Sequence, residues 1–252
     1  MSDRSPAGSS SYPNDLPPAE RIDGIAGGVL LLCDHASNHV PADISLGVLP
    51  ALLDLHIGYD IGAAALTRSL ASSLGVPAVL GTVSRLVIDL HREPDHSGLI
   101  PALSDGHVIP GNQGADRSTR VERFHIPYHA AIEQAVQDYR PELVVAIHSF
   151  TPRLASDGRE RPWQVGILYN EDSRAAHPAI RVLRERGFVT GDNEPYSGRE
   201  LNATLNRHAE AHGIPSMSVE VRNGLIQDEH GVAEWSTILA DVIAQVRAEL
   251  VR

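Results

Sequence analysis

Short apolar runs rich in Val, Ile and Leu alternate along this chain with longer segments that have the period of an amphipathic helix. This alternation constrains the fold more than any other feature. The apolar runs lie at residues 28–33, 78–83, 143–147, 164–168 and 217–221. The helical periods lie at residues 61–74, 118–139, 174–186, 199–212 and 231–251. Strands that alternate with helices are typical of a largely parallel sheet with helices on both faces. The sequence therefore predicts an α/β fold of three layers, built around a mostly parallel, mixed sheet.

The length and the hydrophobic content suit one domain. The chain has 252 residues, of which 42% are hydrophobic, and this is enough to bury a full core. Residues 1–22 are rich in Ser, Pro and Asp and predict a disordered or loosely held leader. No linker divides the rest, so we expect residues 23–252 to form a single domain. Within it, the Gly- and Pro-containing stretch 95–113 predicts a long surface connection, a kind of loop that often acts as a lid.

Charge and hydropathy exclude two classes of partner. A net charge of −11 without a basic run gives no surface for the phosphates of nucleic acid. No apolar stretch approaches the roughly 18 to 20 residues needed to cross a bilayer, and the N-terminus lacks the order of a secretory signal. We therefore expect a soluble, cytoplasmic protein that binds neither nucleic acid nor membrane, and the sequence leaves its oligomeric state open. The single cysteine, Cys33, lies among apolar residues and is expected to be an inert buried thiol.

Polar side chains with metal-binding chemistry stand at the predicted strand ends. His35 and His148 each come at the end of an apolar run, and Glu220 lies within another. In an open α/β sheet, ligands bind beyond the carboxyl ends of the strands. Zinc binds imidazole nitrogens and carboxylate oxygens, and a catalytic zinc site keeps one position open for water. The first hypothesis is therefore a metal-dependent hydrolase with one zinc ion per chain, for which His35 and His148 supply two ligands.

We assign the third ligand to Asp60. Its i, i+4 spacing from His56 would place both side chains on one helix face and turn the carboxylate toward the strand ends. Asp60 could instead cap the N-terminus of the helix that follows it. Asp34, Asn38 and His39 are alternative ligands. Asp34 could also hold the second nitrogen of a ligating histidine, which is the role we assign to it.

Two pairs of histidines have the spacing of a zinc-protease helix but fit that motif poorly. His35 and His39 lack the glutamate that follows the first histidine of HExxH, since alanine occupies that place. His125 and His129 have Pro127 between them, which disturbs a regular helix face. We expect these last two at the surface or behind the ligands, and assign His129 to a supporting role beside the site.

Glu220 is the candidate catalytic base, because a carboxylate beside a bound metal can take a proton from water and return it to the leaving amine. The alternative is a structural ion pair with Arg222, which shares its strand face. Arg85 and Arg92 flank another apolar run, and guanidinium groups bind carboxylates with two parallel hydrogen bonds. We assign Arg85, Arg92 and Arg222 to the binding of an acidic substrate, with ordinary ion pairing as the alternative for each.

Five short motifs occur together and carry a resemblance. They are Asp34-His35-Ala36-Ser37, Ser84-Arg85 through Asp89-Leu90-His91-Arg92, Pro127-Tyr128-His129, Ala146-Ile147-His148-Ser149 and Val219-Glu220-Val221-Arg222. In this order they resemble the N-formylglutamate amidohydrolase family, which is itself similar to zinc carboxypeptidases and to the succinylglutamate desuccinylase and aspartoacylase group. The resemblance runs from about residue 28 to the C-terminus.

The resemblance implies a phosphorylase/hydrolase-like α/β fold and a zinc enzyme that cleaves the amide of a small, acidic N-acyl amino acid. N-formyl-L-glutamate would give formate and L-glutamate. His35 and His148 would match the family's metal ligands, Glu220 its base, and Arg92 the arginine of an Asn-Arg pair that holds a substrate carboxylate.

Two departures affect the expected ligand set and the substrate. Asn38 stands where the carboxypeptidase motif has a ligating glutamate, and His91 replaces the Asn of the Asn-Arg pair. The alternatives are a zinc peptidase or deacylase for another N-acyl amino acid or peptide, and a metal-free protein that binds small acids. A serine hydrolase has little support, because the Gly-x-Ser-x-Gly motif is absent.

Overall fold

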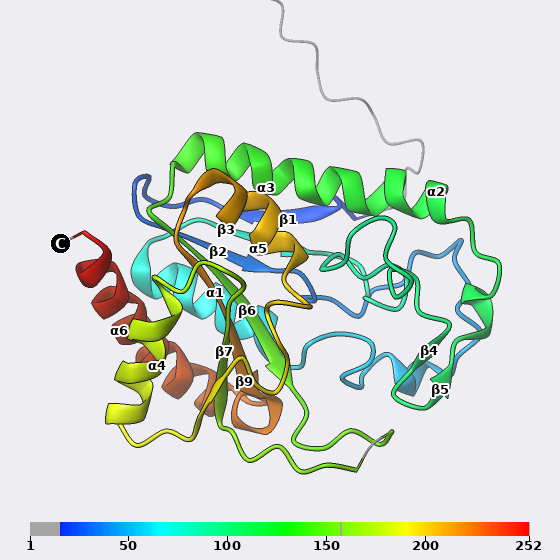
Figure 1. Ribbon diagram of the computed structural model, residues 1–252. Helices are drawn as coiled ribbons and strands as arrows, with labels where there is room; N and C mark the ends of the chain where they lie inside the picture. The colour runs from blue at the N-terminus through cyan, green and yellow to red at the C-terminus, as the bar shows by residue number, and fades with distance from the viewer. Residues whose placement is uncertain (1–15, 157, 252) are drawn as a thin grey trace, which may run out of the picture.

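A computed structural model describes residues 16–251 except residue 157. Its centre is a seven-stranded sheet with the order β1-β3-β2-β6-β9-β7-β8 (Figure 1). The strands are β1 (Ala19–Ile22), β2 (Val29–Cys33), β3 (Ala78–Gly81), β6 (Leu143–Phe150), β7 (Val165–Leu168), β8 (Thr190–Asp192) and β9 (Ser216–Arg222). Strands β3, β2, β6 and β9 are parallel to one another, and β8 is parallel to β7, whereas β1 pairs antiparallel with β3 and β7 antiparallel with β9. The predicted mostly parallel, mixed sheet is confirmed.

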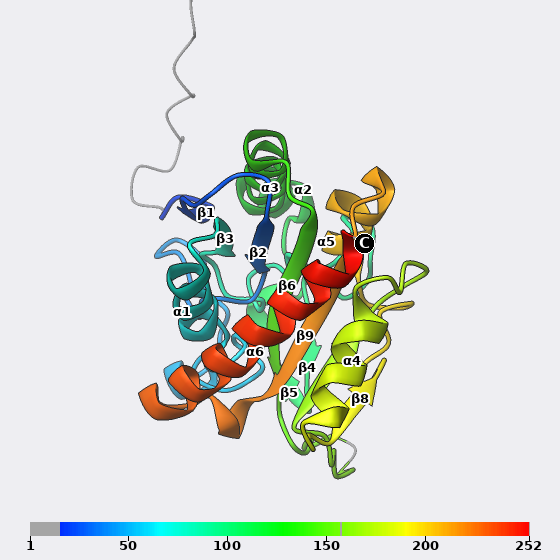
Figure 2. The ribbon, with the colours of Figure 1, turned by 90° about the vertical axis from the view of Figure 1, so that its left-hand side faces the viewer.

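Helices cover both faces of the sheet, which confirms the three layers. Helices α1 (Ala63–Leu74), α4 (Ala176–Glu185) and α6 (Glu229–Leu250) lie side by side on one face (Figure 2). Helices α3 (Ile126–Tyr139) and α5 (Ala203–His208) pack on the other. All five residues of β2 are buried, and they alternate between the two cores: Leu31 packs toward α1 and α6, and Leu32 toward α3. This two-sided burial explains why the central strands read as continuous apolar runs.

The short elements complete the chain. They are the β-hairpin of β4 (Leu103–Ser104) and β5 (His107–Val108), the one-turn helix α2 (Arg117–Arg120), the π-helical turn η3 (Val121–His125), and the 3-10 turns η1 (Pro50–Leu52), η2 (Pro110–Asn112), η4 (Glu210–His212) and η5 (Asn223–Leu225). The expected disturbance near Pro127 is confirmed. The wide π-helical turn lies directly before that proline, between α2 and α3.

Three predictions about local structure need correction. Residues 1–15 of the proposed leader lie outside the described residues, but the boundary at residue 22 is too late, because β1 already pairs with β3. The stretch 95–113 is not an irregular surface loop throughout, since it contains β4, β5 and η2 and buries Leu99 and Ile109. The predicted helix at 199–212 is two short helices, α5 and η4, with a break at Ala209.

Asp60 does not cap α1, and His56 and Asp60 do not share a helix face. The helix begins at Ala63, and its N-cap is Gly62 with φ 82°. A Cβ atom on Gly62 would lie 2.1 Å from the carbonyl oxygen of Ile226, so only glycine fits this turn. Asp60 therefore precedes the helix in a turn.

Within residues 16–251 without 157, no helix combines the length and hydropathy that a bilayer span requires.

Candidate active site

The site lies at the carboxyl edge of the central parallel strands. His35 follows β2 directly, while His148 lies inside β6, where it pairs in register with Glu220 of β9. Asp60 reaches the same edge because its backbone N–H donates to the carbonyl of His35 at 3.0 Å. A cavity of about 110 Å³ opens here. It is lined by His35, Asp60, Arg85, His91, Arg92, His148, Ser149, Leu168, Tyr196, Leu201 and Glu220.

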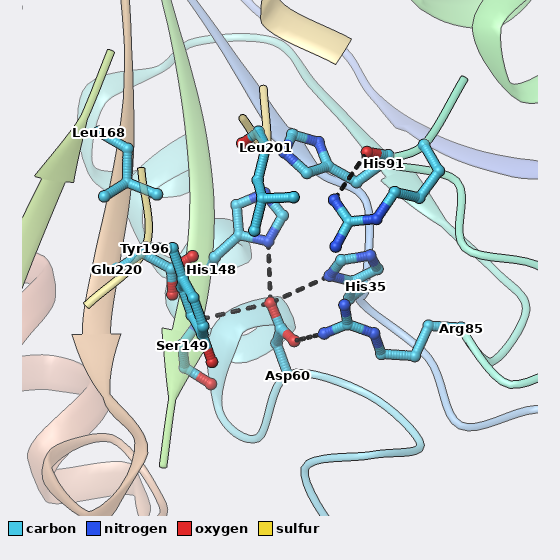
Figure 3. Close-up of a pocket in the computed structure, with 11 residues that line it drawn as sticks. His35, Asp60, Arg85, His91, His148, Ser149, Leu168, Tyr196, Leu201 and Glu220 are labelled. Atoms are coloured by element: carbon cyan, nitrogen blue, oxygen red, sulfur yellow. Dashed lines mark hydrogen bonds and ion pairs between the residues drawn. The ribbon is translucent and has the colours of Figure 1, made fainter. Parts of the chain in front are cut away.

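Three side chains converge on one point of this cavity (Figure 3). Asp60 Oδ2 lies 3.3 Å from His35 Nδ1 and 2.8 Å from His148 Nδ1. One ligand atom from each residue lies within 4.8 Å of the other two. Two imidazole nitrogens and a carboxylate oxygen make a donor set that suits zinc.

The second nitrogen of each of these imidazoles faces a buried carboxylate. His35 Nε2 lies 2.7 Å from Asp89 Oδ1, and His148 Nε2 lies 3.2 Å from Asp34 Oδ2. An N–H donated to the carboxylate fixes the ring and leaves the Nδ1 lone pair free for a metal. Both rings therefore present Nδ1 to the cavity for the same physical reason.

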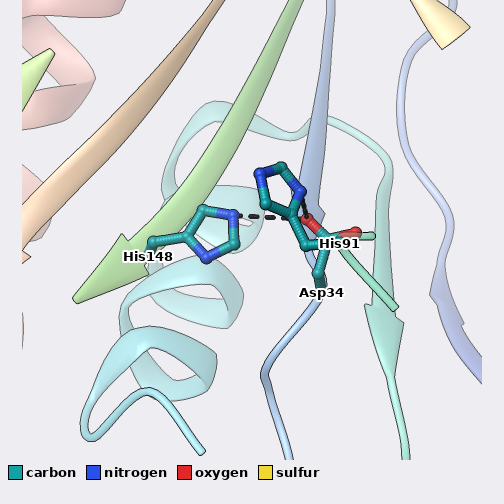
Figure 4. Close-up of side chains that lie close together, drawn as sticks. All are labelled: Asp34, His91 and His148. Atoms are coloured by element: carbon teal, nitrogen blue, oxygen red, sulfur yellow. Dashed lines mark ion pairs between the residues drawn. The ribbon is translucent and has the colours of Figure 1, made fainter. Parts of the chain in front are cut away.

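A second group of possible ligands shares His148 with the first. It consists of Asp34, His91 and His148 (Figure 4). Asp34 is fully buried and does not line the cavity, and its other oxygen accepts hydrogen bonds from Tyr128 and Thr204. A catalytic ion needs an open position for substrate. The group of His35, Asp60 and His148 meets this requirement, and Asp34 is better placed to orient the two rings beside it.

The site holds more negative than positive charge. Asp34, Asp60, Asp89 and Glu220 are all buried, none of them more than 6% exposed. Arg85 pairs with two of them, at 3.1 Å from Asp60 Oδ1 and 2.9 Å from Asp89 Oδ2. Buried carboxylates need compensating charge, so this arrangement favours a cation among them.

The close approach of carboxylates and imidazoles changes the pKa values of both kinds of group. Burial lowers the pKa of His148, but Asp34 and Asp60 outweigh it and raise this pKa well above the ordinary value. Burial raises the pKa of Asp60, but His35 and His148 outweigh it and lower this pKa below the ordinary value. The cluster therefore draws positive charge onto the rings, in the place where a metal ion would supply it.

Glu220 is a carboxylate with free hydrogen-bonding capacity that lines the cavity. Its Oε2 atom is buried and has no hydrogen-bond partner in the part of the chain that the structure describes. Burial raises the pKa of Glu220 to about 7, and the nearby imidazole of His148 opposes this shift. A carboxyl group with a pKa near neutrality can both accept and return a proton.

The three arginines assigned to substrate binding lie in different places. Arg85 lines the cavity, but its guanidinium already holds Asp60 and Asp89. Arg92 lines the cavity and makes a 3.5 Å contact to the carbonyl of His91. Arg222 is not among the residues that line the cavity, and it donates to the carbonyls of residues 162 and 163. Of the three, Arg92 is best placed to meet an anion.

The remaining sequence candidates lie outside the ligand group. Asn38 donates to Asp54 at 2.9 Å, and His39 is absent from the lining of the cavity. His129 is buried, but it contacts the carbonyl of Leu90 at 3.0 Å and His208 at 2.8 Å, not a candidate ligand. The expected burial of Cys33 is confirmed, and this burial raises the pKa of its thiol well above the ordinary value.

Comparison with known proteins identifies the family. The family model described as N-formylglutamate amidohydrolase matches residues 27–227. This chain belongs to the N-formylglutamate amidohydrolase family. The resemblance inferred from the five motifs is thereby confirmed.

Two solved structures are similar to this member of the N-formylglutamate amidohydrolase family. The product of the gene Atu2144 of Agrobacterium tumefaciens has 30% identity and a TM-score of 0.88, over 93% of this chain and 96% of that one. The N-formylglutamate amidohydrolase of Ralstonia eutropha JMP134 has 20% identity and a TM-score of 0.70, over 93% and 97% of the two chains. Among curated proteins, none matches this sequence.

Several residues of the site, among them Asp89, His91 and Tyr196, have no role in the expectations from the sequence. Asp89 and His91 lie within a motif that carries the family resemblance, and this motif was a usable signal for both. Tyr196 lines the cavity from a loop distant in sequence, and no local pattern marks it.

Three buried histidines form a separate cluster behind the site. The rings of His129 and His208 stack at 5.1 Å, and those of His125 and His129 lie 4.1 Å apart. Burial lowers the pKa of His129 to about 3 and that of His208 to about 4, and neighbouring positive charge adds to both shifts. Both rings therefore stay neutral in the folded protein at pH values where they are protonated after unfolding.

We expect this pair to destabilise the protein in acid. An unfolded histidine has a pKa of about 6.5, so between that pH and about 4 the unfolded state binds more protons, and stability falls as pH falls. Each ring contributes at most about 2 kcal/mol of loss between pH 7 and pH 5. Denaturant midpoints measured over this range should show a shallower acid decline for His208→Gln than for the exposed control His177→Gln. Equal declines in both variants would show that this histidine pair does not contribute to the pH dependence of stability.

Proposed function

We propose that this chain is a zinc-dependent amidohydrolase that cleaves the amide of an acidic N-acyl amino acid, with N-formyl-L-glutamate as the best candidate. The observation that carries the proposal is the convergence of His35, Asp60 and His148 beside Glu220 in an open cavity. Family membership supports the reaction class. Arg92 at the cavity wall supports an anionic substrate, because a guanidinium binds a carboxylate in two-pronged fashion.

The residues present fit a divalent cation. Their donor set is of the zinc type, each ring is oriented by a carboxylate, and the local charge is negative. Asp60 would join His35 and His148 in holding the ion. A zinc ion at such a site supplies Lewis acidity, which polarises a carbonyl and makes water more acidic.

Glu220 would move the protons of the reaction. It accepts a proton from the attacking water as the new C–O bond forms at the acyl carbon, and it returns that proton to the nitrogen as the C–N bond breaks. N-formylglutamate and water thus give formate and glutamate, with atoms and charge balanced. Arg92 would bind the carboxylate of the amino acid and so orient the amide.

Metal analysis and a substrate panel test the proposal together. Protein purified without a histidine tag is expected to carry about one zinc per chain. It should release formate from N-formylglutamate faster than from N-formylalanine, and faster than it releases acetate from N-acetylglutamate. Zinc with hydrolysis only of other N-acyl compounds would favour a deacylase of different specificity. Binding of glutamate without zinc or turnover would favour a small-acid binding protein and overturn the enzyme.

Asp89 is expected to tune metal affinity without touching the metal. In Asp89→Asn, the contact to His35 Nε2 loses its charge, so the ring is a weaker and less firmly oriented ligand. Zinc affinity, measured by competition with a chelator, should fall about 10- to 100-fold. The exposed control Asp95→Asn should leave it unchanged. An unaltered affinity in Asp89→Asn would show that the carboxylate does not support the ligand.

A further inference from the structure

A second cavity adjoins the first, and the proposed reaction does not use it. Its volume is about 290 Å³, against about 110 Å³ for the cavity with the candidate ligands. The two share Arg85, Arg92 and Tyr196 as common wall. Sites for small molecules commonly measure roughly 300 to 1,000 Å³, so the first cavity alone is small for a ligand, and the second adds most of the space.

The second cavity presents hydrogen-bond donors. His96 Nδ1 accepts from the backbone N–H of Gly98 at 3.0 Å, so its Nε2 carries the proton and is the free donor. Arg92 lines the same wall and makes no close ion pair among the described residues, although its charge acts on the carboxylate of Asp89. Ser104 adds a hydroxyl group. Such a surface is complementary to a ligand that carries acceptors, and above all to a carboxylate.

The two acids in the wall of this cavity are already bound to other groups of the protein. Asp105 accepts from the backbone N–H groups of Ala155 and Ser156 at 3.0 and 2.8 Å, and it pairs with His56 at 3.0 Å. Asp89 is engaged by His35 and Arg85. The oxygens of both carboxylates are therefore already bound to groups within the protein.

The walls are held in place by contacts that bridge distant segments. Asp105, in the turn of the β4–β5 hairpin, holds the loop at Ala155 through the hydrogen bonds just described. Arg117 donates to the carbonyls of Pro94 and His96 at 2.8 and 3.1 Å and so holds the segment that carries His96. A cavity built in this way is largely formed before a ligand arrives, which lowers the cost of binding.

We propose that the second cavity binds a carboxylate-bearing extension on the amine side of the substrate, with Arg92 and His96 as its contacts. The substrate class then includes N-formylated acidic dipeptides such as N-formyl-glutamyl-glutamate. The inference rests on the proposed function, in which Arg92 meets the amino-acid part of the substrate. Because Arg92 lines both cavities, a substrate chain that continues from the amino acid past Arg92 through a peptide bond enters the second one.

The experiment compares kcat/KM for N-formyl-glutamyl-glutamate with kcat/KM for N-formylglutamate. The wild type should prefer the dipeptide by about tenfold, the effect expected of one charge-assisted contact. His96→Gln, or the bulkier Ser104→Leu, should lower that ratio to near one. The control His107→Gln, on the neighbouring strand of the hairpin and outside the cavity lining, should leave the ratio unchanged.

Binding measured without turnover separates this inference from the proposed function. Glutamyl-glutamate should bind the wild type by calorimetry about tenfold more tightly than glutamate, and His96→Gln should abolish the difference. Hydrolysis of N-formylglutamate with no preference for the dipeptide in rate or binding would overturn the proposed role of the second cavity and leave the proposed function standing. A preference for N-succinylglutamate in place of the dipeptide would put the extension on the acyl side and also overturn it. Dipeptide binding without hydrolysis of any substrate would support the cavity and overturn the amidohydrolase.

Discussion

Replacing Glu220 by Gln is expected to lower kcat for N-formylglutamate by about 10²- to 10⁴-fold, because the amide cannot accept the proton of the attacking water. Zinc content should stay the same, since Glu220 is not among the three residues whose ligand atoms converge. The fold should be at least as stable as that of the wild type. Glutamine has nearly the same shape and removes a buried group whose charge is costly there, as its pKa of about 7 indicates.

Three measurements on the same preparation check this expectation. They are steady-state kinetics, elemental analysis and a thermal melt, with the exposed Glu229→Gln as a matched control in α6. Loss of activity together with loss of zinc would make Glu220 a metal ligand in place of a base. Turnover close to that of the wild type would remove it from the mechanism.

The sequence predicted the layers of the fold because the central strands and the long helices carry strong periodic signals. Strand β2 was predicted to within one residue, and β6 was predicted too short by the segment from His148 to Phe150. That error has a physical cause, since polar His148 and Ser149 inside a strand look like the start of a loop. The edge strands β1 and β8 were missed because each has four residues or fewer and only one paired neighbour.

The site was predictable only in part, because its geometry depends on contacts that no local pattern records. Asp60 was predicted to lie beside the two histidines on the assumption that it shares a helix with His56, but that helix begins only at Ala63. A backbone hydrogen bond to His35, 25 residues away, brings it there. Asp89 reaches His35 across 54 residues, and His91 reaches Thr204 across 113. Spacing within one element can suggest pairs, whereas these pairs arise from how separate loops meet at one edge of the sheet.

Removing single histidines is expected to decide which group of side chains holds the metal. Both candidate groups contain His148, so His148→Ala should lose zinc in either case and leave its buried carboxylate neighbours without a partner. His35 and His91 each belong to only one group. If the ion lies with Asp60 in the open cavity, His35→Ala leaves one imidazole and one carboxylate, which is too few protein ligands for a catalytic zinc site. Activity should then fall to the background rate.

His91→Ala is the matched comparison, since it removes a buried imidazole from the same cavity without removing a ligand of the Asp60 group. Zinc per chain, measured by elemental analysis of protein purified without a histidine tag, should be near zero for His35→Ala and His148→Ala and near one for His91→Ala. The reverse pattern, with zinc kept by His35→Ala and lost by His91→Ala, would move the ion to Asp34. Full occupancy in all three variants would place it elsewhere.

The comparison discriminates because the three rings lie within about 6 Å of one another, so a general disturbance of packing should affect them alike. Only coordination separates His35 from His91.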